Sequence, residues 1–352
     1  MWSVLNYCFE GNTGVGFVVQ DNKVRQWFHV PWLHLGPNPR EFVHGLTRER
    51  SSRPFELSPL QTELYRNYAV GFYNDRGGRE IGRVWRDPLN PDVTNVNFPE
   101  GTVAFKLLFT TAPTSVVPYL GGSPEWAADI DRAQTTQEIL NTVVRLLQID
   151  IAVKDQRADK AEWVFGTFHY DSAVSNTDSW LRLRPLALMW GDDPKLTPSG
   201  YQSGDRPQES WVNPVSPLVI YRQNPPQGAQ PPATLGWAGR ANGPVDNPRS
   251  SCLSCHSTAQ NPAQSPMTPP PTSSEAASLR WFRNLAVNEA FDQGSQTLDF
   301  SLQLGVGIQN LQDFQAFVRN MGGVIPHRFP GSVRTTLTPS DSKEFQFTRD
   351  PE

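Results

Sequence analysis

The sequence predicts an α+β fold, with a β-rich antiparallel sheet at its core, a few helices and long loops rich in proline and glycine. Proline and glycine contribute 32 and 26 of the 352 residues, which favours turns and edge strands over a helix bundle. Apolar side chains alternate with polar ones at residues 147–153, as in a half-buried strand. Aromatic residues make up 11% of the chain, enough to build a core.

The charge balance disfavours two classes of partner. The formal net charge is -4, and the chain has no basic run, so nucleic acid and anionic membrane surfaces are poor partners. The chain contains no stretch of about 18 apolar residues, so no membrane span is predicted. The first residues carry neither a basic segment nor an apolar one, so we expect no signal peptide in this chain.

Residues 1–60 are expected to be irregular. Residues 64–86 mix β-formers around Gly77 and Gly78, which predicts a hairpin. A turn at residues 99–101 leads into an expected strand at 102–109. Residues 136–142 are expected to form one or two helical turns.

A second hairpin is predicted from residues 147–154 and 162–170, with a short polar turn between them. Its first strand should bury the side chains of Leu147, Ile149, Ile151 and Val153 on one face.

The last third of the chain is expected to hold the clearest helices. A Pro/Ser/Thr-rich loop at 257–273 precedes a predicted helix at 275–291, capped by Ser273 or Ser274. A short strand and a helix at 310–319 follow, ended by Gly322 and Gly323. We therefore divide the chain into an aromatic- and His-rich extension packed on the core (1–95), a sheet domain (96–330) with an insertion (171–245), and a peripheral tail (331–352).

The most specific motif is Cys252-Leu-Ser-Cys255-His256. Two thiols at this spacing, followed at once by an imidazole, are typical of covalent haem c attachment, with the histidine as an axial iron ligand. A zinc site would need four ligands, and only Cys8 remains as a third cysteine. A thioredoxin-like dithiol would lie in a βαβ unit, whereas this motif has proline-rich flanks. Cys8 is expected to be a lone buried thiol.

Whether a residue occupies the second axial position of the iron would distinguish a catalytic or gas-binding protein from an electron carrier. A sixth ligand from Met or His is typical of electron carriers, whereas an open position suits catalysis or gas binding. The candidates for a sixth ligand are Met189, Met267, Met321, His29, His34, His44, His169 and His327. The first three of these histidines also leave open a second metal site.

Three segments together with the haem motif resemble the cytochrome P-460 and cytochrome c′-beta family. The segments are Pro99-Glu-Gly-Thr-Val-Ala-Phe-Lys106, Ile149-Asp-Ile-Ala-Val-Lys-Asp155 and Glu162-Trp-Val-Phe-Gly-Thr-Phe168. The resemblance implies a β-sheet c-type cytochrome, often with an open distal haem site, whose members handle hydroxylamine or nitric oxide. It also implies that Lys106 is the candidate for a haem contact or cross-link. This chain departs from the family by its long first segment, its insertion and its long C-terminal part.

Other residues near the motif are weaker candidates. Arg240 and Arg249 are cations that suit haem propionates, and Asp150 is an acid that could accept protons. Trp163 and Tyr170 are candidate redox-active aromatics, although packing in the sheet explains them equally well.

The sequence therefore predicts a mono-haem c-type cytochrome oxidoreductase, with Cys252 and Cys255 as the tethers and His256 as the iron ligand. Its substrate would be a small molecule and its electron acceptor a partner cytochrome; a homodimer is left open. The alternatives are an electron carrier with a six-coordinate haem, and a gas-binding or peroxidase-like protein. Covalent haem attachment normally takes place outside the bacterial cytoplasm, so a periplasmic or exported location is expected, with any leader already removed.

Overall fold

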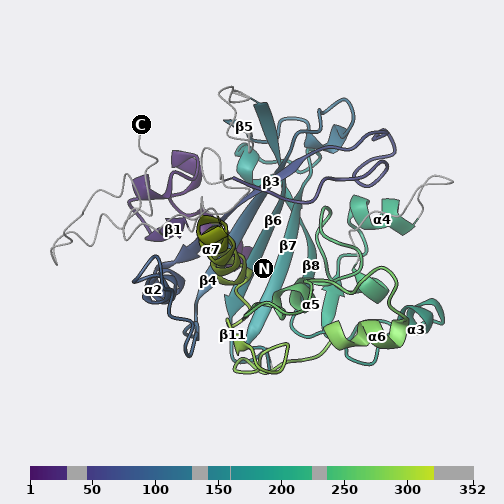
Figure 1. The fold of residues 1–352 in the computed structure, drawn as a ribbon. Helices are drawn as coiled ribbons and strands as arrows, with labels where there is room; N and C mark the ends of the chain where they lie inside the picture. Colours follow the sequence, from purple (N-terminus) through teal and green to yellow (C-terminus); the bar gives the residue numbers. More distant parts are fainter. Residues whose placement is uncertain (30–45, 129–141, 159, 224–235, 321–352) are drawn as a thin grey trace.

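The computed structural model describes residues 1–29, 46–128, 142–158, 160–223 and 236–320 (Figure 1). The strands of this part are β1 (Trp27–His29), β2 (Thr47–Arg48), β3 (Asn67–Asn74), β4 (Val103–Thr110), β5 (Glu125–Ala128), β6 (Thr142–Lys154), β7 (Trp163–Tyr170), β8 (Leu183–Met189), β9 (Ser210–Val212), β10 (Gln260–Asn261) and β11 (Gln296–Thr297). The helices are α1 (Trp2–Phe9), α2 (Asp75–Val84), α3 (Pro198–Gln202), α4 (Pro217–Gln223), α5 (Cys252–His256), α6 (Glu275–Ser278) and α7 (Leu302–Asn320).

Nine of the described strands form one large antiparallel sheet, in the order β1-β3-β4-β6-β7-β8-β9, with β2 beside β3 and β5 beside β6. Strands β10 and β11 form a separate antiparallel pair. The fold is therefore α+β with a sheet core, as predicted. Strand pairing places Gly71, Lys106, Asp150 and Thr167 side by side across four neighbouring strands. This polar row crosses the middle of the sheet.

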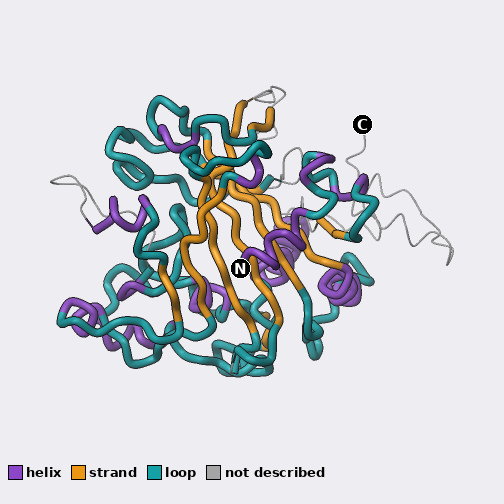
Figure 2. Tube along the Cα trace, turned by 180° about the vertical axis from the view of Figure 1, so that it is seen from behind, coloured by secondary structure: helices purple, strands orange, loops and turns teal. Residues whose placement is uncertain are grey.

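The two faces of the sheet are covered by different parts of the chain. Helices α5 and α7 lie in front of the sheet in Figure 1, and the N-terminal helix α1 covers the opposite face in Figure 2. Side chains such as Leu5, Phe105 and Ile149 belong to the core on the α1 face, whereas Leu253 and Leu304 belong to the core on the other face. Strand alternation separates these two cores.

The central strands confirm the predicted pattern. β4, β6 and β7 lie where the sequence places them, and β6 and β7 form the expected antiparallel hairpin. Leu147, Ile149 and Ile151 are buried, and Val153 is partly buried against the same core. Strand β3, from the first 95 residues, pairs with β4 along its length.

The predicted hairpin at 64–86 is wrong, because β3 is followed by helix α2. The side chain of Asn74 caps this helix by accepting a hydrogen bond from the Gly77 N–H at 3.2 Å. The two glycines let the helix approach its neighbours: a Cβ on Gly78 would lie 2.3 Å from the Phe28 ring. The Gly-Gly pair therefore serves close packing rather than a turn.

The C-terminal helices also differ from expectation. The predicted helix at 275–291 ends after one turn, although Ser274 caps it as expected. The chain leaves the helix to bury two successive side chains in different places: the Trp281 indole donates to the Pro266 carbonyl, and Phe282 stacks on Trp237. Helix α7 begins at residue 302 rather than 310, capped by the Ser301 hydroxyl, which accepts from the Leu304 N–H.

The first 60 residues are more regular than expected, because residues 2–9 form helix α1. Of the helical turns expected at 136–142, residues 136–141 lie outside the described residues, and Thr142 begins strand β6. The glycines at 322 and 323 and the tail at 331–352 also lie outside the described residues. Within the part that the structure describes, no helix is both long and apolar enough to cross a membrane.

A buried ion pair joins the sheet to the turn that precedes α7. Lys154, at the end of β6, places its Nζ 2.7 Å from Asp299 Oδ1, and the side chains are 2% and 0% exposed. The Trp163 indole and the Phe98 N–H also donate to the Asp299 carboxylate, at 2.9 and 2.6 Å. A buried charge with this many partners is well satisfied.

Lys154→Met should therefore lower the free energy of unfolding by about 3–5 kcal/mol, because it leaves the Asp299 carboxylate buried without its countercharge. Urea denaturation measures the change. Arg157→Ala is the matched control, since it breaks an exposed ion pair with Asp155 and should leave the urea midpoint unchanged. Equal midpoints for both variants would contradict a structural role for the buried pair.

Candidate functional site

The Cys-x-x-Cys-His motif folds as a short helix, α5, because its sequence supplies its own cap. The Ser251 hydroxyl accepts from the Ser254 N–H at 3.0 Å, and the Ser254 hydroxyl accepts from the Ser251 N–H at 2.8 Å. This reciprocal pair is a capping box. The Ser251 hydroxyl also donates to the buried carboxylate of Asp192 at 2.7 Å, which fixes the start of the helix to the loop after β8.

Cys252, Cys255 and His256 line one wall of a cavity of about 740 Å³ between α5, α7 and the sheet. Both thiols are free and partly exposed. A pocket that holds a cofactor typically measures about 300–1,000 Å³. The motif is therefore presented to a space of the size that a haem needs.

His256 is held in a defined tautomer. Its Nδ1 lies 2.8 Å from the Phe300 carbonyl oxygen, and since a carbonyl only accepts, Nδ1 carries the proton. Burial lowers the pKa of His256 to about 4, so the imidazole is neutral and Nε2 keeps its lone pair. The ring also packs on Phe165, with 4.7 Å between centroids. A neutral imidazole with Nδ1 hydrogen-bonded is the form that binds a metal through Nε2.

The floor of the cavity is the polar row of the sheet. Lys106 Nζ lies 3.5 Å from Asp150 Oδ2, the Thr167 hydroxyl donates to Asp150 Oδ1 at 2.8 Å, and the Gln148 amide donates to the same carboxylate at 2.8 Å. Burial raises the pKa of Asp150 to about 6, although Lys106 opposes this rise. Burial would lower the pKa of Lys106, but the carboxylates of Glu49, Asp150 and Asp246 outweigh it and hold that pKa above its ordinary value.

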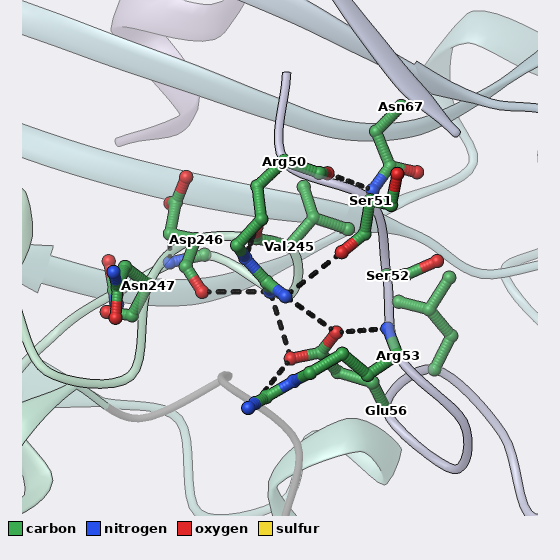
Figure 3. A network of polar contacts seen from close by, with 12 residues as sticks. Arg50, Ser51, Ser52, Arg53, Glu56, Asn67, Val245, Asp246 and Asn247 are labelled. Carbon is green, nitrogen blue, oxygen red and sulfur yellow. Dashed lines mark hydrogen bonds and ion pairs between the residues drawn. The ribbon is translucent and has the colours of Figure 1, made fainter. Parts of the chain in front are cut away.

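The rim of the cavity is fastened by Arg50 (Figure 3). Its guanidinium donates to the carbonyls of Val245 and Asp246, both at 3.0 Å, and forms an ion pair with Glu56 at 2.8 Å. These bonds join the segment after β2 to the loop that leads into the Cys-x-x-Cys-His motif. Gly243 lets that loop lie against the sheet, because a Cβ there would meet the Gln148 amide at 2.0 Å.

Helix α7 forms the wall that the sequence did not predict. Gln303, Val306 and Asn310 line the cavity, but the predicted helix began at residue 310. The signal that could have found this wall is Ser301, a cap residue that precedes an apolar pattern. Gly305 and Gly307 weaken the helical pattern in the first turns.

The candidate sixth ligands fall in different places. Met267 lines the cavity and is 47% exposed. Met189 is buried under α5, where its sulfur accepts from the Leu253 N–H. His169 is buried against Ser216 and Tyr119, and His29 Nδ1 donates to the Gly71 carbonyl at 3.2 Å. Met321, His34, His44 and His327 lie outside the described residues.

The two arginines near the motif also differ in their roles. Arg240 is fully buried and donates to the carbonyls of Asp192, Asp193, Leu196 and Trp237, so it is a structural residue rather than a propionate partner. Arg249 lies on the loop before α5, and the described residues that line the cavity do not include it.

The remaining candidates belong to the structure of the sheet and its core. The Trp163 indole donates to Asp299, and the buried Tyr170 hydroxyl donates to the Gly121 carbonyl. Cys8 is buried as expected, and burial raises the pKa of its thiol. Among the described residues, no group of three or more His, Cys, Asp or Glu side chains gathers as it would around a metal ion.

The residues present fit a covalently bound haem. Two free thiols and a neutral imidazole share one short helix, they face the same cavity, and the imidazole leaves Nε2 for iron. Comparisons with protein family models, with curated proteins and with solved structures found no match.

Thiol counting tests this arrangement. In denaturant, the haem-loaded protein should show one reactive thiol, Cys8, because the other two are expected as thioethers. The same chain produced without haem should show three in denaturant and at most two when folded, since Cys8 is buried. Three reactive thiols in the denatured haem-loaded protein would contradict the attachment.

Proposed function

We propose that this protein is a mono-haem c-type cytochrome oxidoreductase that acts on a small molecule at an open distal haem site. The observation that carries the proposal is the presentation of Cys252, Cys255 and His256 to one cavity, with His256 Nδ1 bound to the Phe300 carbonyl. When bound, the haem would supply an iron that binds a small ligand and exchanges electrons.

The chain would contribute attachment, orientation and proton transfer. Cys252 and Cys255 would hold the haem, and His256 would bind its iron through Nε2. The Lys106 ammonium and the Asp150 carboxylate, 3.5 Å apart, would hold protons inside the cavity. Because the pKa of Asp150 is about 6, this carboxyl can take up and release a proton near neutral pH.

The substrate class follows from the resemblance to the cytochrome P-460 and cytochrome c′-beta family, whose members handle hydroxylamine or nitric oxide. A partner cytochrome would accept the electrons, and an exported location such as the periplasm would supply the setting for covalent attachment. The substrate class thus rests on the resemblance, and the exported location rests on the Cys-x-x-Cys-His motif.

A second candidate function is electron transfer by a six-coordinate haem. The observation that favours it is the place of Met267, whose side chain lines the same cavity as His256. A thioether bound to iron would close the distal site and leave the protein as an electron carrier.

Co-production with a haem c maturation system tests the proposed function. The wild-type protein should retain haem on a denaturing gel, and its ferrous absorption spectrum should change when carbon monoxide is added. Cys252→Ala/Cys255→Ala should lose the stain, whereas Cys8→Ala should keep it as the matched control. An unstained wild-type band would contradict the proposal.

The carbon monoxide response separates the two candidate functions. A low-spin ferrous spectrum that carbon monoxide does not change would contradict the open site. If Met267→Ala then gained carbon monoxide binding, the electron-transfer function would replace the oxidoreductase.

Lys106→Met tests the polar floor. We expect the haem and its Soret band to be unchanged, because a protonated Lys106 paired with Asp150 makes a contact rather than a bond. Loss of the ammonium should raise the pKa of Asp150 further, so the acidic limb of the pH–rate profile should move up by about 1–3 units. A strongly red-shifted wild-type Soret band that the substitution abolishes would show a Lys106 cross-link instead.

A further inference from the structure

The turn before helix α7 connects the buried ion pair to the haem motif. Asp299 receives hydrogen bonds from Lys154 Nζ, the Trp163 indole and the Phe98 N–H, and its side chain is fully buried. The next residue is Phe300, whose carbonyl oxygen lies 2.8 Å from His256 Nδ1. A single peptide unit therefore separates the anchored carboxylate from the acceptor of the histidine proton.

The backbone of this turn is held in an uncommon conformation. Asp299 and Phe300 have φ angles of 46° and 61°, a region that side-chain-bearing residues seldom adopt. Such a strained backbone conformation persists only when several contacts with neighbouring residues hold it in place. Here the Asp299 carboxylate fixes one side, and the Ser301 hydroxyl, 3.0 Å from the Tyr73 hydroxyl, fixes the other.

The two ends of α5 are thus anchored separately. Ser251, bound to Asp192, fixes the first turn of the helix, and the Phe300 carbonyl fixes the imidazole at its end. The hydrogen bond on Nδ1 of a metal-binding histidine orients the ring and raises the basicity of the other nitrogen. The direction of the Phe300 carbonyl therefore controls how strongly His256 would donate to iron.

We propose that Asp299 is a positioning residue that, through the Phe300 carbonyl, sets the orientation and the donor strength of His256 and so tunes the reduction potential of the haem. This inference rests on the proposed function, because it needs a haem bound at His256. Asp299 itself is not among the described residues that line the cavity, so its effect is indirect.

The test compares the haem-loaded wild type with Asp299→Asn. Asn tolerates the same backbone region but loses the charge that fixes Lys154. The weaker Nδ1 hydrogen bond should make His256 a poorer donor, which stabilises ferric iron less. The reduction potential should therefore rise, and the Fe–His stretching frequency of the ferrous five-coordinate haem, measured by resonance Raman, should fall.

Two further variants separate positioning from general destabilisation. Asp171→Asn is the matched control: Asp171 is another buried carboxylate, paired with Arg184, and it does not line the cavity. This control should lower stability but leave the potential unchanged. Trp163→Phe removes one donor to Asp299 while keeping an aromatic ring, and should shift the potential in the same direction by less, even if Asp299→Asn fails to fold.

The outcomes distinguish the inference from the proposed function. Wild-type protein without covalent haem would overturn both. Two results with the haem-loaded protein would overturn the positioning role and leave the proposed function standing. In the first, Asp299→Asn and Trp163→Phe have the same reduction potential as the wild type. In the second, Asp171→Asn shifts the potential as much as Asp299→Asn does.

Discussion

The buried carboxylate of Asp299 is the interaction on which the arrangement of the site depends. Two successive residues in the left-handed region, Asp299 and Phe300, cost about 1–3 kcal/mol each. The three donors to the carboxylate offset that cost, since a hydrogen bond to a charged group contributes about 1.5–3 kcal/mol. They come from β6, β7 and the segment before β4, so the sheet itself holds the turn. These hydrogen bonds therefore hold the turn in the conformation that directs the Phe300 carbonyl toward His256.

The sheet also explains why the cavity has a polar floor. Strand alternation places Phe105 and Ile149 in the core on the α1 face, and places Lys106 and Asp150 on the opposite face. Charged groups in such a position would be costly under a closed apolar layer. They are tolerated because they bind each other and face a cavity rather than packed side chains. The same register that builds the core thus brings Lys106, Asp150 and Thr167 together on the floor of the cavity.

The sequence predicted the central sheet well, because alternation and β-propensity are local signals that the packing of β4, β6 and β7 reinforces. It also singled out Cys252, Cys255 and His256, which the structure places along one cavity, whereas haem attachment there stays a prediction. It could not predict that Gly78 serves helix packing against Phe28, since that contact joins distant parts of the chain. The Asp299 turn was missed for the same reason: its partners lie 136 to 201 residues away. Lys106 was singled out by resemblance, but its partners Asp150 and Thr167 follow only from the strand register.

Mass spectrometry of the protein produced with haem c maturation tests the central claim most directly. Trypsin should release residues 250–280 as one peptide, since Arg249 and Arg280 flank a stretch without lysine or arginine. That peptide contains Cys252, Cys255 and His256. We predict that it carries the mass of one haem and has no free thiol. Recovery of the peptide at its unmodified mass, with both cysteines free, would contradict the account.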